Sequence, residues 1–417
     1  MDGSASSNQF ASPDRVPRTA FAGLFIANGA AMLGMGILLP LLSPFAKRLG
    51  ASGTIVGIIF AGYALARGIF SPLFGRISDR YGRKNIMLVG LFLYAGLSFG
   101  YILLHQIVVL AILWFCQGVA SAMVTPIAQS YIGDITPQGK EGRVMNLFYL
   151  GQFGGVAIGP AIGGYLTDHV SFNAPFFVMA AAAAIGFALV QFVVPRRSKS
   201  KTNRDKKEEN NSQNSFLDVL KDRSMRGILS YMVGRGFYRW GFNSFFPIYA
   251  VSIASLSHSQ VGLIITSYMI TGTLLQYPFG RLADRIAEHR AELVALGGGM
   301  AALTTLAVPL IRQMVWLVLL VVVMGIFSAI SRASTVAIRT ERGRVHGMGA
   351  VTGVYTAGFS TGQVMGPLGF GVISDIWNIP ISFYIGGLAG LLTTGLAYWY
   401  LYHESAGDRK NFNDSGR

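Results

Sequence analysis

The residues Gly155-Val-Ala-Ile-Gly-Pro-Ala-Ile-Gly-Gly164 lie inside an apolar run that is long enough to cross a membrane. Glycines recur there at every fourth position: Gly151, Gly155, Gly159 and Gly163. On a helix this spacing leaves one face without side chains, so a second helix can approach to backbone contact. Pro160 removes one backbone donor and clashes with the preceding turn, so we expect it to bend this helix.

A similar pattern returns 207 residues further along the chain. Its members are Gly358, Gly362, Gly366 and Pro367. Because a pattern repeated at a long fixed spacing indicates internal duplication, we expect two similar halves, each with one glycine-faced helix. Such a helix in each half is typical of a two-lobed membrane protein whose lobes move against each other.

The composition excludes an ordinary soluble domain. The 417 residues are 52% hydrophobic and 13% charged, compared with about 25% charged residues in soluble domains. A soluble core cannot bury this much apolar surface, so the chain is expected to be a polytopic membrane protein. The net charge of +15 is also found in nucleic-acid-binding proteins, but the positions of the charges, given below, favour a membrane protein without a nucleic-acid partner.

Apolar stretches of about 20 residues predict twelve transmembrane helices. They lie near 19–44, 53–74, 86–104, 107–132, 144–166, 173–195, 226–250, 260–279, 292–311, 314–338, 346–372 and 380–402. The prediction is an all-α protein of two pseudo-symmetric six-helix bundles. Its expected parts are a cytoplasmic tail (1–18), the first bundle (19–195), a charged linker (196–225), the second bundle (226–403) and a second cytoplasmic tail (404–417).

The lysines and arginines predict the orientation. With the N-terminus inside, 27 of the 34 basic residues fall in the tails, the linker and the cytoplasmic loops. The outer loops hold only Lys47, Arg48 and Arg312. Positive charge concentrates on the cytoplasmic side of membrane proteins, so both termini are expected in the cytoplasm and the chain in the plasma (inner) membrane. The high pI follows from this topology, with anionic lipid as a favourable surface.

The loop between the second and third spans carries a compact charged motif. It reads Gly75-Arg-Ile-Ser-Asp79-Arg80-Tyr-Gly82-Arg83-Lys84, in which two glycines allow a tight turn. The loop between the eighth and ninth spans contains a shorter copy, Gly280-Arg-Leu-Ala-Asp284-Arg285, at an offset of 205 residues. Two unrelated motifs at nearly the same offset strengthen the case for duplication.

On these motifs the whole chain resembles the major facilitator superfamily. Segment 75–84 matches the signature loop of that superfamily, and segment 155–164 matches the fifth-helix motif of its twelve-helix drug/proton antiporters. Asp134 with Ile135-Thr136-Pro137 is similar to the end of the fourth helix in that group. The resemblance implies two bundles around a central cavity, alternating access by rocking, and protons as the coupling ion.

Two sets of residues are expected to control the conformational change. Asp79, Arg80, Arg83 and Asp134 are predicted to form a charge network at the cytoplasmic membrane edge. The simpler interpretation is a topology anchor that keeps the loop inside. The full set of conformational candidates is Gly75, Asp79, Arg80, Gly82, Arg83, Asp134, Gly155, Gly159, Pro160, Gly163, Asp284, Gly366 and Pro367.

Charges within the spans point to the binding site. The interior ones are all arginines: Arg67, Arg235, Arg239 and Arg332, and no Asp or Glu lies in the middle of a span. A charge at mid-bilayer costs about 2.5–3.5 kcal/mol on insertion scales, so it normally faces a wet cavity or a partner. Arg235 lies near the midplane with Arg239 one turn further, whereas Arg67 and Arg332 lie close enough to the cytoplasmic side to snorkel.

Further polar and aromatic side chains complete the predicted substrate site: Asn28, Tyr63, Gln152, Tyr238, Trp240 and Tyr355. Taken singly, each of these residues more often makes a hydrogen bond between packed helices than a contact with a ligand. The histidines lie at loops or helix ends, and neither a metal site, a cofactor motif nor a catalytic group is expected.

The leading hypothesis is a monomeric, proton-coupled exporter of a small anionic, zwitterionic or amphiphilic molecule, because arginine suits carboxylate, sulfate and phosphate. Multidrug efflux of cations, uptake of organic anions, and a membrane sensor or assembly component without net flux are the alternatives. An enzyme is not expected, since the spans contain neither paired carboxylates nor a nucleophile with a base.

Overall fold

The computed structural model describes residues 18–103, 106–137, 140–195 and 219–415. Within these residues the secondary structure is helical and contains no strand. The expected N-terminal tail up to residue 17, and residues 196–218 of the expected linker, lie outside the described residues.

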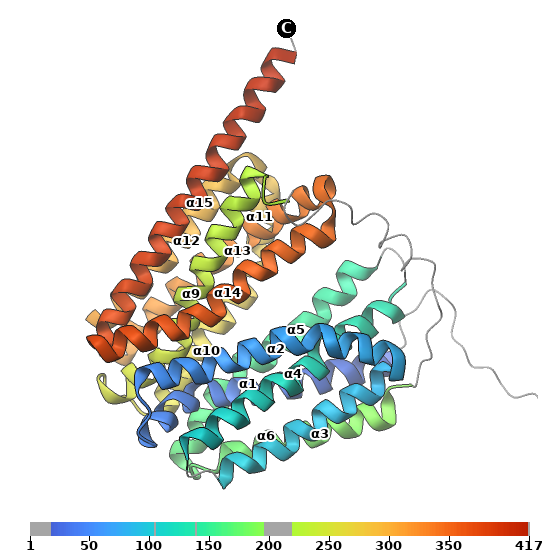
Figure 1. The fold of residues 1–417 in the computed structure, drawn as a ribbon, viewed down its shortest axis with the longest axis vertical. Helices are drawn as coiled ribbons and strands as arrows, with labels where there is room; N and C mark the ends of the chain where they lie inside the picture. Colours follow the sequence, from blue (N-terminus) through green and yellow to red (C-terminus); the bar gives the residue numbers. More distant parts are fainter. Residues whose placement is uncertain (1–17, 104–105, 138–139, 196–218, 416–417) are drawn as a thin grey trace, which may run out of the picture.

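The first six helices form one bundle, the N-half. They are α1 (Arg18–Arg48), α2 (Gly53–Tyr81), α3 (Arg83–Ile102), α4 (Ile107–Ile135), α5 (Glu141–His169) and α6 (Ala174–Val193). Within it, α1 packs against α5 and α6, while α4 packs against α2 and α3. Short connections keep successive helices antiparallel, as Figure 1 shows.

The second bundle, the C-half, repeats this arrangement. Its helices are α9 (Arg223–Ser252), α10 (His258–Leu274), α11 (Gln276–Arg285), α12 (Arg290–Ala307), α13 (Met314–His346), α14 (Met348–Ile376) and α15 (Ile379–Ser415). The pair α10 and α11 together occupies the position of one span, so the two halves match helix for helix. In the C-half, α9 packs against α14 and α15 as α1 packs against α5 and α6.

Two expected boundaries differ from the structure. The span expected over 260–279 is broken at Leu275 into α10 and α11. Pro278 explains the break, because it has no N–H to continue the hydrogen-bond ladder and clashes with the carbonyl four residues earlier. At the other boundary, α15 continues past residue 404 as one helix to Ser415, and the cytoplasmic position of this tail stays a prediction.

Among the described residues, eight helices are long and apolar enough to cross a membrane: α1, α2, α3, α4, α6, α12, α13 and α15. The helices α5, α9 and α14 are about as long but carry more glycine or polar residues. In the N-half α5 pairs with α1, and in the C-half α9 pairs with α14. Small residues allow these pairs to pack closely.

The glycine-faced helices make the backbone contacts that their sequence predicts. A β-carbon on Gly159 of α5 would lie 2.6 Å from the Cα of Gly36 in α1, and one on Gly163 would lie 2.6 Å from the carbonyl oxygen of Ile37. A β-carbon on Gly155 would overlap the carbonyl of Gly29. In the C-half, Gly366 of α14 has the same relation to α9. Helix α5 continues through Pro160 without a break.

The two halves share one hydrophobic core at one end and have separate cores further along. The shared cluster joins α1 residues such as Leu38 and Leu42 to α9 and α10 residues such as Tyr249 and Ile264. A second cluster draws its members only from the N-half, and a third only from the C-half. The ribbons accordingly meet at the left of Figure 1 and diverge to the right.

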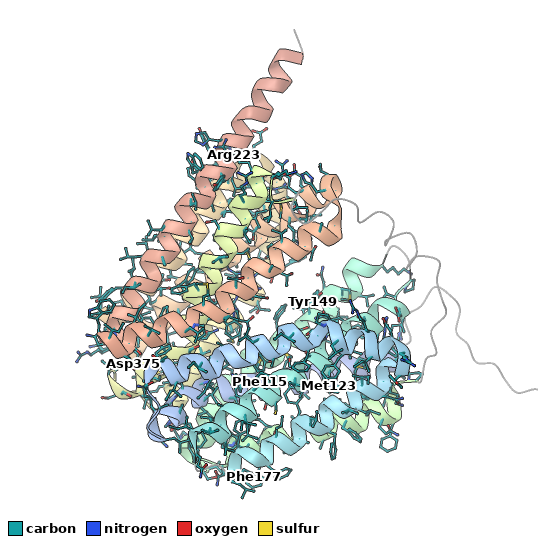
Figure 2. All side chains as sticks on the ribbon, in the orientation of Figure 1. Phe115, Met123, Tyr149, Phe177, Arg223 and Asp375 are labelled. Carbon is teal, nitrogen blue, oxygen red and sulfur yellow. The ribbon has the colours of Figure 1, made fainter. Side chains whose placement is uncertain are left out.

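We call the joined end, where α2 and α10 begin and α5 and α14 finish, the closed end. Figure 2 shows Asp375 at this end and Arg223 at the far end of the C-half. Tyr149, on α5, lies on the side of the N-half that faces the C-half, to the right of both in this view.

Candidate functional site

Three of the predicted arginines come together inside the C-half. Arg235 and Arg239 lie one turn apart on α9, and Arg332 comes from α13. Arg332 interacts electrostatically with both of the others, so the three guanidinium groups form one region of positive charge. We call them the arginine cluster. Arg235 is the most buried, with 4% of its surface exposed.

The arginine cluster is short of acceptors. Within the described part of the chain, the buried Nε and Nη2 of Arg235 and the buried Nε of Arg239 and Arg332 have no hydrogen-bond partner. The ion pairs found among the described residues do not include any of the three. Buried donors without partners are costly, so this region favours an anionic or acceptor-rich occupant.

Aromatic rings surround two of these guanidinium groups. Arg235 lies over Phe359 of α14, with its Cζ 5.9 Å from the ring centre, and Arg239 lies over Tyr268 of α10 at 5.7 Å. The faces of aromatic rings stabilise cations, although they do not satisfy the N–H donors. The site can therefore hold its arginines in place while their donors stay available.

Gln276 is a polar residue within the eighth expected span, but it was not included in the predicted substrate site. Its Oε1 accepts a hydrogen bond of 3.0 Å from Nη1 of Arg332. Gln276 is the first residue of α11, so the break at Leu275 positions this amide next to the arginine cluster. The Gln276-Tyr-Pro278 sequence was the available signal, because a proline near a polar residue inside a span often marks a broken helix at a binding site.

A cavity of about 500 Å³ extends from this amide toward the far end of the C-half. It opens between α11 and α13 and is lined by Gln276, Gly280, Asp284, Arg290, Ala333, Val336, Ala337, Thr340, Glu341 and Arg344. The cavity is large enough for a small organic molecule. Its lining runs from Gln276, the hydrogen-bond partner of Arg332, to Asp284 in the second copy of the loop motif.

The candidates in the N-half do not join the arginine cluster. Arg67 is half-buried on α2. Gln152 accepts a hydrogen bond of 3.0 Å from Nε2 of Gln129, and Tyr63 donates to the sulfur of Met35 at 3.4 Å and stacks on Trp114. Both amide atoms of Asn28 are buried without a partner in the described chain. Apart from Arg67 these side chains are neutral, so the candidate site residues of the N-half are mostly uncharged.

The remaining candidates lie in the C-half. Tyr238 is buried, packs against Gly390 of α15 and interacts electrostatically with Arg235 and Arg239. Trp240 is half-buried against the shared core. Tyr355 of α14 lies under the guanidinium of Arg339, with 4.9 Å between Cζ and the ring centre.

Three of the four residues of the predicted charge network, Asp79, Arg83 and Asp134, come together at the far end of the N-half. Arg83 pairs with Asp79 at 3.6 Å and also with Asp134 at the end of α4. Gly82 has a φ of +93°, a conformation that side chains disfavour, and this turn places Arg83 at the first position of α3. Arg80 lies over the ring of Tyr81 at 5.5 Å.

The C-half contains a counterpart that the sequence analysis missed in part. Arg290 pairs with Glu341 at 2.9 Å and with Asp284 at 4.0 Å. Arg290 and Glu341 each lie 207 residues after Arg83 and Asp134. The offset of the glycine motif therefore identifies both residues.

Two bundles of paired helices, with an interior charged site and a shared core at one end only, define a helical membrane transporter of the two-lobed kind. The sequence pattern of the Major Facilitator Superfamily matches residues 24–254 and 232–416. The chain belongs to this superfamily. It is an integral membrane protein and a secondary transporter, not an enzyme.

Several known proteins are similar to this chain over most of its length. The chain is 27% identical over 383 residues to the uncharacterized MFS-type transporter MJ1560 of Methanocaldococcus jannaschii, covering 90% of this chain and 96% of that one. It is 26% identical over 370 residues to the quinolone resistance protein NorA of Staphylococcus aureus, covering 86% and 92%. Among solved structures, a bacterial homolog of the human lysosomal transporter Spinster, inward-facing and unoccupied, matches with a TM-score of 0.75 at 13% identity, covering 94% and 98%.

Proposed function

We propose that this protein exports small organic molecules that carry an anionic group, in exchange for protons, by alternating access. The anionic group binds at the arginine cluster, and zwitterions and amphiphiles with such a group are included. The observation that carries this proposal is the set of buried guanidinium donors of Arg235, Arg239 and Arg332 without partners in the described chain. A ligand carboxylate, sulfate or phosphate supplies the missing acceptors in pairs.

The orientation is part of the proposal. The excess of lysine and arginine in the tails, the linker and the loops at the far end supports a cytoplasmic position for that end and for both termini. The closed end then faces outward, and the arrangement in Figure 1 is open toward the cytoplasm. In this state, substrate enters from the cytoplasm between the halves and through the cavity beside α11. The protein acts as a monomer in the plasma membrane.

The charge network is proposed to hold the other state. The ion pairs of Arg83 and of Arg290 lie at the far end of the two halves. This end comes together in the other state of the transporter, in which the closed end is open. Partly exposed ion pairs exchange partners at little cost, so they suit a contact that forms and breaks in each cycle. The glycine contacts of α5 and α14 give the packed surfaces on which the helices move.

A second candidate is efflux of cationic drugs. The names of two similar proteins favour it: the quinolone resistance protein NorA and multidrug resistance protein 2 of Bacillus subtilis, which is 24% identical over 395 residues. In this candidate the arginines serve only packing and the aromatic rings hold the substrate. The direction of flux distinguishes uptake of organic anions from export. The absence of flux would indicate a sensor.

The test is flux into energised everted membrane vesicles, with an anionic and a cationic fluorescent dye of matched size. We expect gradient-dependent accumulation of the anion that falls at least tenfold in Arg235→Ala, because removal of one partner from a charged hydrogen bond costs about 1.5–3 kcal/mol. Arg235→Lys keeps the charge and should retain an intermediate rate.

Arg312→Ala is the matched control, since this arginine is exposed in a loop at the closed end. It should leave the flux unchanged. Cation accumulation that ignores Arg235→Ala would instead support cationic drug efflux. An uncoupler that leaves anion flux intact would contradict the proton coupling.

A further inference from the structure

Two aspartates hold the halves together at the closed end. Asp168, in the last turn of α5, reaches the start of α10 in the other half. Its Oδ2 accepts from the backbone N–H of Ser259 at 2.6 Å, and its Oδ1 accepts from the backbone N–H of His258 at 3.3 Å and lies 3.0 Å from Nδ1 of His258. One carboxylate from the N-half thus binds the first turn of a helix in the C-half.

Asp375 makes the mirror contact. It lies in the last turn of α14 and reaches the start of α2 in the N-half, where Oδ1 accepts from Gly53 at 2.6 Å and Oδ2 accepts from Thr54 at 2.7 Å. The two carboxylates are 207 residues apart, and the helix starts that they bind are 205 residues apart. The duplicated halves have therefore produced a reciprocal pair of contacts, which we call the crossed caps.

The chemistry of each contact is that of a helix cap. The first N–H groups of a helix have no partner within the helix, and the positive end of the helix dipole attracts an anion. Ser52 and Ser257 already cap α2 and α10 from within their own chains, by accepting from Ile55 and Gln260. The aspartates bind the N–H groups that these serines leave, so each helix start is fully satisfied only while the halves are joined.

The carboxyl groups lie past the apolar stretches of their helices, and their pKa values fit a bound anion. Burial raises the pKa of Asp168, but hydrogen bonds from Ser259, Ser257 and His258 outweigh burial and lower the pKa to about 2. For Asp375, burial likewise raises the pKa, and hydrogen bonds from Thr54, Gly53 and Ser52 outweigh it and lower the pKa. Both groups are therefore ionised in the joined state.

Glycine at the same places lets the backbones meet. A β-carbon on Gly371 of α14 would lie 2.5 Å from the carbonyl oxygen of Gly53, and one on Gly164 of α5 would overlap that of His258. The same two helices, α5 and α10, also share a hydrogen bond of 3.1 Å from the backbone N–H of Ala161 to the hydroxyl oxygen of Thr266. The crossed caps sit in tight contact with the opposite half, so they break when the halves separate.

We propose that the crossed caps are the gate of the closed end: Asp168 and Asp375 each hold a helix start of the opposite half, and both contacts break each time this end opens. The gate sets the balance between the two states of the transporter independently of what is bound at the arginine cluster. The inference goes beyond the proposed function and depends on neither the substrate nor the coupling ion.

The experiment measures the separation of the halves directly. Spin labels are placed on Val170→Cys and Trp377→Cys in a Cys116→Ala background, with the full chain in lipid nanodiscs. Both positions are exposed, at 65% and 59%, and each lies two residues beyond one of the carboxylates in opposite halves. Pulsed electron paramagnetic resonance then gives the populations of short and long distances.

Asp168→Ala and Asp375→Ala are each expected to raise the ratio of long to short distances about 2- to 30-fold, the range for loss of a capping side chain. The double variant is expected to show roughly the product of the two effects. Asp168→Asn and Asp375→Asn keep an acceptor oxygen and should shift the ratio less in the same direction, which carries the test where an alanine variant does not fold.

Glu288→Ala is the control, because this carboxylate is exposed at the opposite end of the C-half. It should leave the distance ratio unchanged. A folded double alanine variant with the distances of the unsubstituted caps would overturn the proposal, as would an equal shift in the Glu288→Ala control. Failure of dye flux with intact distance shifts would refute the proposed function and leave the gate standing.

Discussion

The N-half and the C-half share a scaffold but differ in what they bury. In both, a glycine-faced helix packs on the first helix of the half, and a loop arginine pairs with two carboxylates. The interior of the C-half holds the arginine cluster and a helix broken at Leu275. The interior of the N-half holds the neutral amides of Asn28 and Gln117, and α2 is continuous through Pro72.

This difference indicates how a duplicated fold can acquire a single binding site. Packing and cap contacts are needed equally by both halves, so they persist at a constant offset. A binding site is needed once, so charge and an irregular helix can gather in one half while the other supplies a neutral wall. The predictions that follow test which features are shared and which belong to the C-half alone.

The largest effect is expected at the glycine contacts, and it should be equal in the two halves. Gly159→Ala and Gly366→Ala each place a methyl group against backbone of the neighbouring helix, at 2.6 Å or less. Overpacking typically costs about 1–3 kcal/mol and occasionally more, and here the clash is with backbone, which cannot rotate away as a side chain can. We expect both variants to show a clearly lowered Tm in detergent.

The controls lie on the same two helices. Gly154 of α5 and Gly353 of α14 have no atom within 4 Å of an added β-carbon. Alanine there should keep or raise the Tm, because alanine favours a helix over glycine by up to about 1 kcal/mol. A large loss at Gly159 with none at Gly366 would break the equivalence of the halves.

The second effect belongs to the C-half. Gln276→Ala removes the acceptor of Arg332 and leaves a charged donor unpaired, at a cost of about 1.5–3 kcal/mol. Gln129→Ala removes a bond between two neutral amides, which contributes about 0.5–1.5 kcal/mol. Thermal unfolding should therefore show the larger loss for Gln276→Ala.

Arg332→Met sharpens this comparison. In that background the charged donor is absent, so adding Gln276→Ala should cost less than it does alone. Equal losses for Gln276→Ala and Gln129→Ala, with no coupling to Arg332, would mean that the amide does not support the arginine cluster.

Sequence predicted the shared features better than the particular ones. Spans and glycine contacts follow from local patterns of apolar and small residues, and the pairing of Arg83 with Asp79 and Asp134 followed from motifs. The contact between Gln276 and Arg332 depends on a helix break, which shifts the direction of one side chain. The crossed caps join residues from opposite halves, and a single helix pattern contains no information about its partner. The 207-residue offset links Asp168 with Asp375, yet only the packed halves show what they bind.

The loop arginines should give a smaller effect that is stronger in the N-half. The partners of Arg83, Asp79 and Asp134, have 41% and 52% of their side chains exposed, whereas Asp284 and Glu341 beside Arg290 have 76% and 62% exposed. Exposed ion pairs contribute at most about 1 kcal/mol and weaken in salt. Arg83→Ala should lower the Tm slightly more than Arg290→Ala at low salt, and the gap should close at high salt. A larger and salt-independent loss for Arg290→Ala would reverse the comparison.

The smallest effect concerns pH, and it should have the same sign at both caps. Because the pKa of Asp168 is lowered to about 2 while the closed end is joined, its contribution is present above the usual aspartate range, and it is lost as the pH falls toward 2. The same sign holds for Asp375, whose pKa is also lowered. Neither carboxylate should change the spin-label distances between pH 5 and 8. The distances are measured by pulsed electron paramagnetic resonance across this window. A change between pH 5 and 8 that disappears in Asp168→Ala or in Asp375→Ala would contradict the lowered pKa of that carboxyl group.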